Sequence, residues 1–271
     1  MLLSFRGFSA ALLIAVSAFV LTSCGEDDDD SPTPQNATCT LTKMKSFWQE
    51  SDFDYDATGR MVRLTKIDTI GSDVSVTLTE ISYSADNATV YAKKSYFARE
   101  NGADTPEYPY AEFDTAKLQS GRVVWERDFK KRKLTFSYDA DGHLLKALRA
   151  TGEADFEYTW QGGNLVKSVM PDVTPAYVTT LTISYFDSLT NPVYAYNYYG
   201  TNNLGLPAHF YGTQSKNLPK KAVSRTGDQA EKVFTSTYMR NSNGAPTTAN
   251  VAYPLSGTSV NYPIYFAYNC R

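Results

Sequence analysis

Val178-Thr179-Thr180-Leu181-Thr182-Ile183-Ser184-Tyr185-Phe186 is the stretch that decides the fold. Apolar side chains at 181, 183 and 185 alternate here with hydroxyl side chains at 180, 182 and 184. Because successive side chains of a strand point to opposite faces, this period of two predicts a half-buried antiparallel strand with one face toward water. The same alternation recurs at 134–138 and 156–160. With 20 Tyr and 14 Phe in 271 residues, the sequence predicts a mainly β protein.

Short turns separate the predicted strands. Residues 55–60 (YDATGR) and 138–143 (YDADGH) share one plan: an aromatic residue, Asp, two residues, Gly, and a long side chain. Asp bonds to the backbone ahead of it and Gly adopts the positive φ that closes a turn, so each segment predicts a hairpin. Successive hairpins predict one large twisted antiparallel meander over 37–271, rolled into an open half-barrel or a sandwich-like domain. A short helical or irregular crossover is expected near 188–219, where the alternation fades.

The N-terminal residues predict an export signal and a lipid anchor. Arg6 precedes an apolar stretch from Ser9 to Val20, which is the layout of a secretory signal. Residues 21–24 (LTSC) resemble the bacterial lipobox, and the resemblance implies removal of 1–23 and acylation of Cys24. Several acyl chains on one cysteine give stable anchoring. The alternative is an ordinary signal followed by a chance cysteine.

Residues 24–36 predict an extended acidic, Pro-rich tether. The acidic run from Glu26 to Asp30 looks like the post-cysteine signal of Bacteroidetes-type surface lipoproteins, which implies an outer-membrane protein facing the cell exterior. The alternative is a solvated spacer kept extended by like-charge repulsion. Beyond residue 30 the chain holds 25 basic and 24 acidic residues. A nearly neutral body has no clustered charge to attract nucleic acid, so we expect no nucleic-acid partner. The acyl chains on Cys24 make the membrane the expected partner.

Two further cysteines, Cys39 and Cys270, stand near the two ends of the predicted domain. Outside the cytoplasm disulfides persist, so these residues are candidates for a bond if the first and last strands are neighbours. The alternative is two separate small buried residues.

The hairpins carry a family resemblance. The Phe-x-Tyr-Asp-x-x-Gly pattern at 53–59 and 136–142 looks like the YD-type hairpins of Rhs and teneurin shells. A closer resemblance is to a domain-of-unknown-function family of Bacteroidetes lipoproteins, through Asn191-Pro192 and the Gly-x-x-Ser-Lys-Asn-Leu-Pro segment at 212–219. It implies a β fold and a surface role, and no known activity.

No motif in the sequence indicates catalysis, a cofactor or a metal. His143 and His209 have no ligand spacing, and no nucleophile elbow or phosphate loop occurs. Glu153, Asp155 and Glu157 alternate along one predicted strand, and we interpret them as its wet face. A pair of carboxylates across a sugar would instead suggest a carbohydrate-active enzyme.

Aromatic residues in the irregular segment give the best hint of binding. Exposed tyrosines can stack on sugars or anchor a protein partner, but they can also fill the core. The candidates are Tyr194, Tyr196, Tyr198, Tyr199 and Tyr211. Asp-Ser/Thr-aliphatic triplets also make weak O-glycosylation candidates of Thr69, Thr115 and Ser188.

The sequence therefore predicts a lipid-anchored, non-enzymatic surface protein that binds a glycan or an envelope protein. The alternatives are a scaffold without a ligand site, a carbohydrate-active enzyme, and a lipid-carrying half-barrel.

Overall fold

The structure is a computed structural model that describes residues 39–70, 73–100, 102–107, 111–127, 132–172, 174–191, 206–255 and 258–270. All of them belong to one compact unit, Pro34–Arg271. The predicted signal peptide, Cys24 and the tether lie outside the described residues. None of the helices in this described part is long and apolar enough to cross a membrane.

Strands make up most of the described chain. They are β1 (Cys39–Lys45), β2 (Gln49–Tyr55), β3 (Met61–Ile70), β4 (Asp73–Tyr83), β5 (Thr89–Glu100), β6 (Ala103–Pro106), β7 (Glu112–Gln119), β8 (Arg122–Arg127), β9 (Lys133–Tyr138), β10 (Leu144–Arg149), β11 (Ala154–Gln161), β12 (Asn164–Met170), β13 (Thr179–Thr190), β14 (Asn217–Thr226), β15 (Lys232–Arg240), β16 (Pro246–Leu255) and β17 (Thr258–Cys270). Two 3-10 helices accompany them, η1 (Pro175–Tyr177) and η2 (Ala208–Tyr211).

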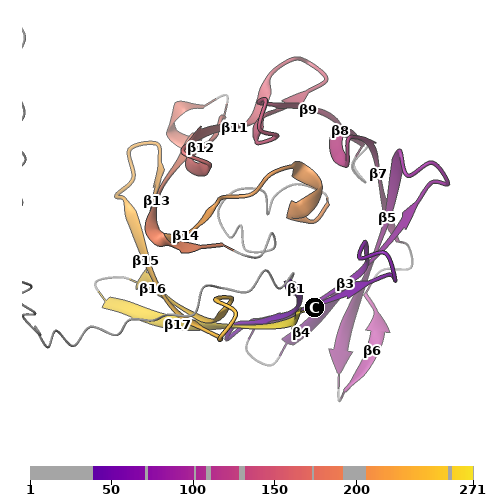
Figure 1. Cartoon of the computed structure of the whole chain (residues 1–271), viewed down its shortest axis with the longest axis horizontal. Helices are drawn as coiled ribbons and strands as arrows, with labels where there is room; N and C mark the ends of the chain where they lie inside the picture. The colour runs from indigo at the N-terminus through magenta and orange to yellow at the C-terminus, as the bar shows by residue number, and fades with distance from the viewer. Residues whose placement is uncertain are drawn as a thin grey trace, which may run out of the picture. The chain divides into compact units, whose positions relative to one another are not determined.

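The strands form a closed antiparallel barrel (Figure 1). Each strand pairs with the next along the chain, except that β6 is a side strand on β5 and β5 also pairs with β7. The first and last strands, β1 and β17, pair with each other and complete a ring of 16 strands. The predicted mainly β meander is confirmed. The barrel is closed, whereas the sequence predicted an open half-barrel or a sandwich, because β1 pairs with β17.

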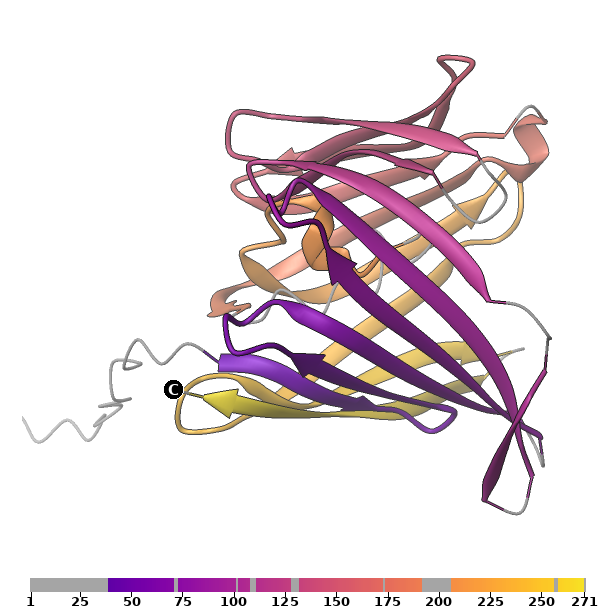
Figure 2. The same ribbon diagram turned by 90° about the vertical axis from the view of Figure 1, so that its right-hand side faces the viewer.

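The two ends of the barrel are named here by their connections. The near end holds the β2–β3, β4–β5, β7–β8, β9–β10, β11–β12, β13–β14 and β15–β16 connections, and the far end holds the others. Figure 2 shows the tilted strands from the side. Cys39 and Cys270, at the outer ends of β1 and β17, belong to the near end.

Aromatic side chains link successive hairpins at the near end. In each case a Tyr or Trp in the second half of one strand donates a hydrogen bond to a backbone carbonyl near the start of the preceding strand. The donor–acceptor pairs are Tyr55–Leu41, Tyr83–Met61, Tyr138–Val123, Trp160–Leu144, Tyr185–Leu165 and Tyr238–Pro219, at 2.7–3.0 Å. We call each of these an aromatic clasp. Their rings pack against the apolar core, and the Tyr hydroxyl or Trp indole N–H at the ring's edge is hydrogen-bonded to the backbone.

The residue after the turn glycine covers the ring of the next clasp. The Arg60 guanidinium lies 4.6 Å from the centre of the Tyr83 ring, and that of Arg122 lies 5.2 Å from the centre of the Tyr138 ring. His143 stacks on Trp160 with the ring centres 4.4 Å apart. The ring-covering side chain thus recurs in three near-end turns, two of which, at 55–60 and 138–143, carry the full aromatic–Asp–x–x–Gly–long-side-chain pattern.

The segment from 206 to 216, which contains η2, lies inside the ring (Figure 1). Its Phe210 and Tyr211 belong to the same apolar cluster as Val123, Phe136 and other inward residues of the wall. The connection predicted as a crossover near 188–219 joins β13 and β14, which are antiparallel neighbours. The described part of this connection, 206–216, enters the barrel, and its Leu206, Phe210 and Tyr211 belong to the apolar core.

Candidate functional site

The predicted binding aromatics do not form an exposed surface in the described part of the chain. Tyr211 is 1% exposed, its ring packs 5.2 Å from that of Phe136, and its hydroxyl donates a hydrogen bond to the Glu126 carboxylate. Its expected role as a surface contact is therefore wrong, because the side chain anchors η2 to the barrel wall. Tyr194, Tyr196, Tyr198 and Tyr199 lie outside the described residues.

The other predicted site residues lie on strands. Thr69 and Ser188 are exposed on β3 and β13, whereas Thr115 is half-buried in β7. Cys39 and Cys270 are directly opposite each other in the register of β1 and β17. Opposite residues of antiparallel strands have Cα atoms about 4.5–5.5 Å apart, within the separation that a disulfide spans. This register meets the condition on which the predicted bond depends, and the bond itself stays a prediction.

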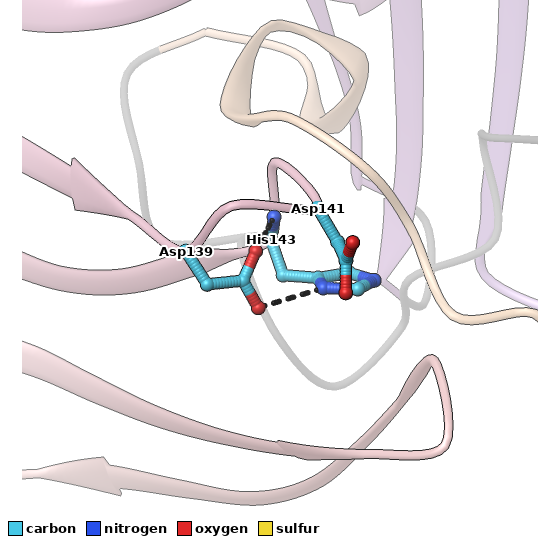
Figure 3. Close-up of side chains that lie close together, drawn as sticks. All are labelled: Asp139, Asp141 and His143. Carbon is cyan, nitrogen blue, oxygen red and sulfur yellow. Dashed lines mark hydrogen bonds and ion pairs between the residues drawn. The ribbon is translucent and has the colours of Figure 1, made fainter.

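Three potential metal ligands come together in the β9–β10 turn. Asp139, Asp141 and His143 each offer a ligand atom within 4.8 Å of the others. Figure 3 shows the Asp139 carboxylate against Nδ1 of the His143 ring, with an Asp139 Oδ2 to His143 Nδ1 distance of 2.9 Å. The His143 backbone N–H also donates to Asp139 Oδ1. Burial alone would raise the pKa of Asp139, but these bonds from His143 outweigh it and leave the pKa below its ordinary value.

The same arrangement without a histidine occurs in the β2–β3 turn. There Arg60 donates through Nε to Asp56 Oδ2 at 2.8 Å, and Asp56 Oδ1 accepts from the Arg60 backbone. Hydrogen bonds from Thr58 and Arg60 hold the pKa of Asp56 far below its usual range. His143 and Arg60 therefore do the same two things: each binds the turn aspartate and covers the next clasp ring. This repetition explains the cluster as part of the turn.

A pocket of about 280 Å³ lies at the far end of the barrel. Residues in or beside three successive far-end connections line it. They are Arg132 at β8–β9, Arg149 and Asp155 on the strands that flank β10–β11, and Met170, Asp172 and Tyr177 at β12–β13. Small-molecule sites usually measure about 300–1,000 Å³, so this volume is at the lower limit for such a site. Convergent connections on a rigid scaffold are a common place for binding residues.

Asp155 reaches this pocket because of a β-bulge. The register of β10 and β11 shifts between Ala147 and Leu148, so that Asp155 and Phe156 face the same stretch of β10. Both are buried, which strict alternation would not allow for consecutive residues. The prediction that Asp155 lies on the wet face with Glu157 was therefore wrong: Glu157 binds Lys146 at 3.0 Å in the exposed positions, while Asp155 turns inward.

The Asp155 carboxylate is held from one side. Arg149 Nε donates to Oδ1 at 2.7 Å, and a second guanidinium nitrogen of Arg149 lies 2.5 Å from the same oxygen. Within the described chain no hydrogen bond ends on Oδ2. The Asp155 side chain is 12% exposed, whereas Tyr177 in η1 is 63% exposed. Sequence reasoning missed this group, because only the bulge shows that Asp155 leaves the wet face.

Buried charges inside the barrel are held by specific partners. Asp114 and Glu126 are each 1% exposed. Lys94 Nζ lies 2.6 Å from Asp114 Oδ2, and Glu126 accepts the Tyr211 hydroxyl. Burial, followed by the Glu126 charge, raises the pKa of Tyr211 well above its ordinary value. Glu126 therefore helps to hold η2 in place, and Asp114 is paired with a lysine of β5.

The outer wall of the barrel is charged. Lys146 and Glu157 alternate with the core residues Ala147, Phe156 and Tyr158, so their side chains point outward. Other outward cross-strand ion pairs follow the same rule. They are Lys93–Glu80 at 3.0 Å, Lys43–Glu50 at 2.5 Å and Arg63–Asp54 at 3.2 Å.

Comparison with solved structures finds a similar barrel. The structure of a porin-like protein from Bacteroides uniformis matches with a TM-score of 0.57 and 14% sequence identity, covering 84% of this chain and 98% of that one. The likeness is one of fold alone. No family model matches the chain. None of the curated proteins matches it either.

Proposed function

We propose that this protein is a lipid-anchored outer-membrane protein whose barrel stands in water and acts as a non-enzymatic binding module for a glycan or an envelope protein. The observation that carries the proposal is the charged outer wall. A barrel wall that faces lipid needs an apolar band about 25 Å tall, and a Lys or Arg at its midplane costs about 2–4 kcal/mol. Ion pairs such as Lys146–Glu157 and Lys93–Glu80 lie in mid-strand on that wall.

The apolar core inside the barrel also supports a barrel that stands in water. The near-end core is an apolar cluster built from inward residues and η2, which is the arrangement of a domain that folds in water. Anchorage then has to come from outside the barrel, and acylated Cys24 at the start of an acidic tether supplies it. The far-end pocket supports a binding role.

The test is fractionation of cells that express the full chain or its Cys24→Ala variant. The wild-type chain should incorporate radiolabelled palmitate and sediment with the outer membrane. Cys24→Ala should incorporate none and move to the soluble fraction, while the control Cys270→Ala, which leaves the lipobox intact, stays labelled and membrane-bound. Retention of Cys24→Ala in carbonate-washed membranes, or an unlabelled wild-type chain, would contradict the proposal.

A scaffold or spacer without a ligand site is the second candidate, and the burial of Tyr211 favours it. The two functions differ in a glycan array and an envelope pull-down with the full chain. Binding that survives washing supports the module, and no binding in either experiment supports the scaffold.

A further inference from the structure

The described residues that line the far-end pocket include two basic and two acidic side chains, Arg132, Arg149, Asp155 and Asp172. The formal charges of these four side chains cancel, so together they give no electrostatic preference for an anion or a cation. The Arg149 guanidinium already makes two charge-assisted contacts to Asp155 Oδ1, so its charge attracts an anionic ligand less than that of an unpaired guanidinium would.

The pocket nevertheless presents adjacent donors and acceptors. Asp155 Oδ2 accepts no hydrogen bond within the described chain, and the Arg149 side chain, 46% exposed, keeps donors beyond those used on Oδ1. A carboxylate oxygen next to a guanidinium matches two neighbouring hydroxyl groups, one donating to Asp155 and the other accepting from Arg149. Asp172 is held in place by the Thr174 backbone N–H, which donates to Oδ1 at 2.9 Å.

Apolar surface completes the site. Tyr177 and Met170 are exposed at 63% and 38%, and both line the pocket. A large, rigid ring in this position can cover the C–H face of a flat ligand at a low cost in conformational entropy. The pocket volume of about 280 Å³ suits one small ring or the end of a chain.

We infer that this pocket binds a neutral, polyhydroxylated ring, such as one uncharged sugar unit of a glycan, with Asp155 and Arg149 on neighbouring hydroxyls and Tyr177 on the ring face. The inference rests on the binding role proposed above and names its ligand class. Asp155 owes its position to the β-bulge, and bulges often re-aim a side chain toward a functional site.

The test is saturation-transfer NMR on the full chain in detergent micelles. The probes are methyl glycosides of glucose, galactose and mannose, with the methyl glycoside of glucuronic acid as the charged counterpart. At least one neutral glycoside should bind, and Tyr177→Ala and Asp155→Asn should each weaken its Kd by about tenfold or more. Tyr265→Ala removes an exposed ring from β17, and Lys146→Ala removes a charge from the outer face of β10. Both should bind like the wild type.

The inference is overturned if no neutral glycoside binds, if only the glucuronide binds, or if Tyr177→Ala binds as tightly as Tyr265→Ala. Tyr177 is largely exposed, so its variant folds and decides the question even if Asp155→Asn is unstable. Lipidation of Cys24 does not enter this measurement. A negative result here combined with normal palmitate labelling would reject the ligand class and leave the anchored barrel intact.

Discussion

Removal of the Tyr211 hydroxyl should loosen the segment that fills the barrel. In Tyr211→Phe the ring still packs against Phe136, but Glu126 loses a donor and the Leu206 backbone N–H loses its acceptor, 2.9 Å away. A hydrogen bond to a charged group contributes about 1.5–3 kcal/mol, and an orphaned buried N–H costs about 1–3 kcal/mol. We therefore expect the free energy of unfolding to fall by about 3–5 kcal/mol.

The measurement is urea unfolding followed by circular dichroism, with Tyr138→Phe as the matched control. Tyr138→Phe breaks a single neutral bond, from the hydroxyl to the Val123 carbonyl at 2.7 Å, and should cost about 1 kcal/mol. A double-mutant cycle of Tyr211→Phe with Glu126→Gln should give a coupling energy of about 1–2 kcal/mol. If Tyr211→Phe costs no more than Tyr138→Phe, or the coupling is zero, η2 is not held by this bond.

Three other changes test separate features of the barrel. Cys39→Ser should lower the free energy of unfolding under oxidising conditions only. A disulfide that closes about 230 residues contributes about 5 kcal/mol in the loop-entropy model and ~2–4 kcal/mol in typical measurements. Equal stability of the wild type with and without reductant would refute the bond. Gly212→Ala should lower stability by about 2–3 kcal/mol in thermal melting, because Gly212 has φ +90° and a Cβ there would lie 2.3 Å from the Gly142 carbonyl oxygen. The control Gly59→Ala, with φ +83° and open space around it, should cost about 1 kcal/mol. Equal losses would show that the backbone around Gly142 moves aside at little cost. Burial lowers the pKa of His209 to about 4, against an ordinary value of 6.5, so the unfolded chain gains the proton first and the free energy of unfolding decreases as the pH falls from about 6.5 to 4. We expect a loss of about 1–2 kcal/mol between pH 7 and 5 in the wild type and none of this loss in His209→Gln. The same pH profile in both proteins would contradict the assignment.

Local patterns predicted the strands well. The alternation at 134–138 and 156–160 lies within β9 and β11, and the alternating stretch at 178–186 falls almost entirely within β13. The Asp–x–x–Gly plan correctly marked the turns at 56–59 and 139–142, where the turn backbone N–H bonds back to the aspartate carbonyl. These features depend on residues close together in the chain, and a single sequence reports them directly.

Long-range features escaped prediction because they depend on register. Closure of the barrel depends on β1 meeting β17, more than 200 residues apart. The far-end pocket depends on one bulge that turns Asp155 inward. No local pattern encodes any of these.

The aromatic clasps have a consequence for assembly and for evolution. Each clasp joins residues only 14–22 positions apart in the chain, so it can form as soon as two successive strands have been made, without waiting for the barrel to close. A duplication or deletion of one whole hairpin keeps both its own clasp and the acceptor for the next. Barrels of this design can therefore change in girth by two strands at a time, with the last strand still meeting the first.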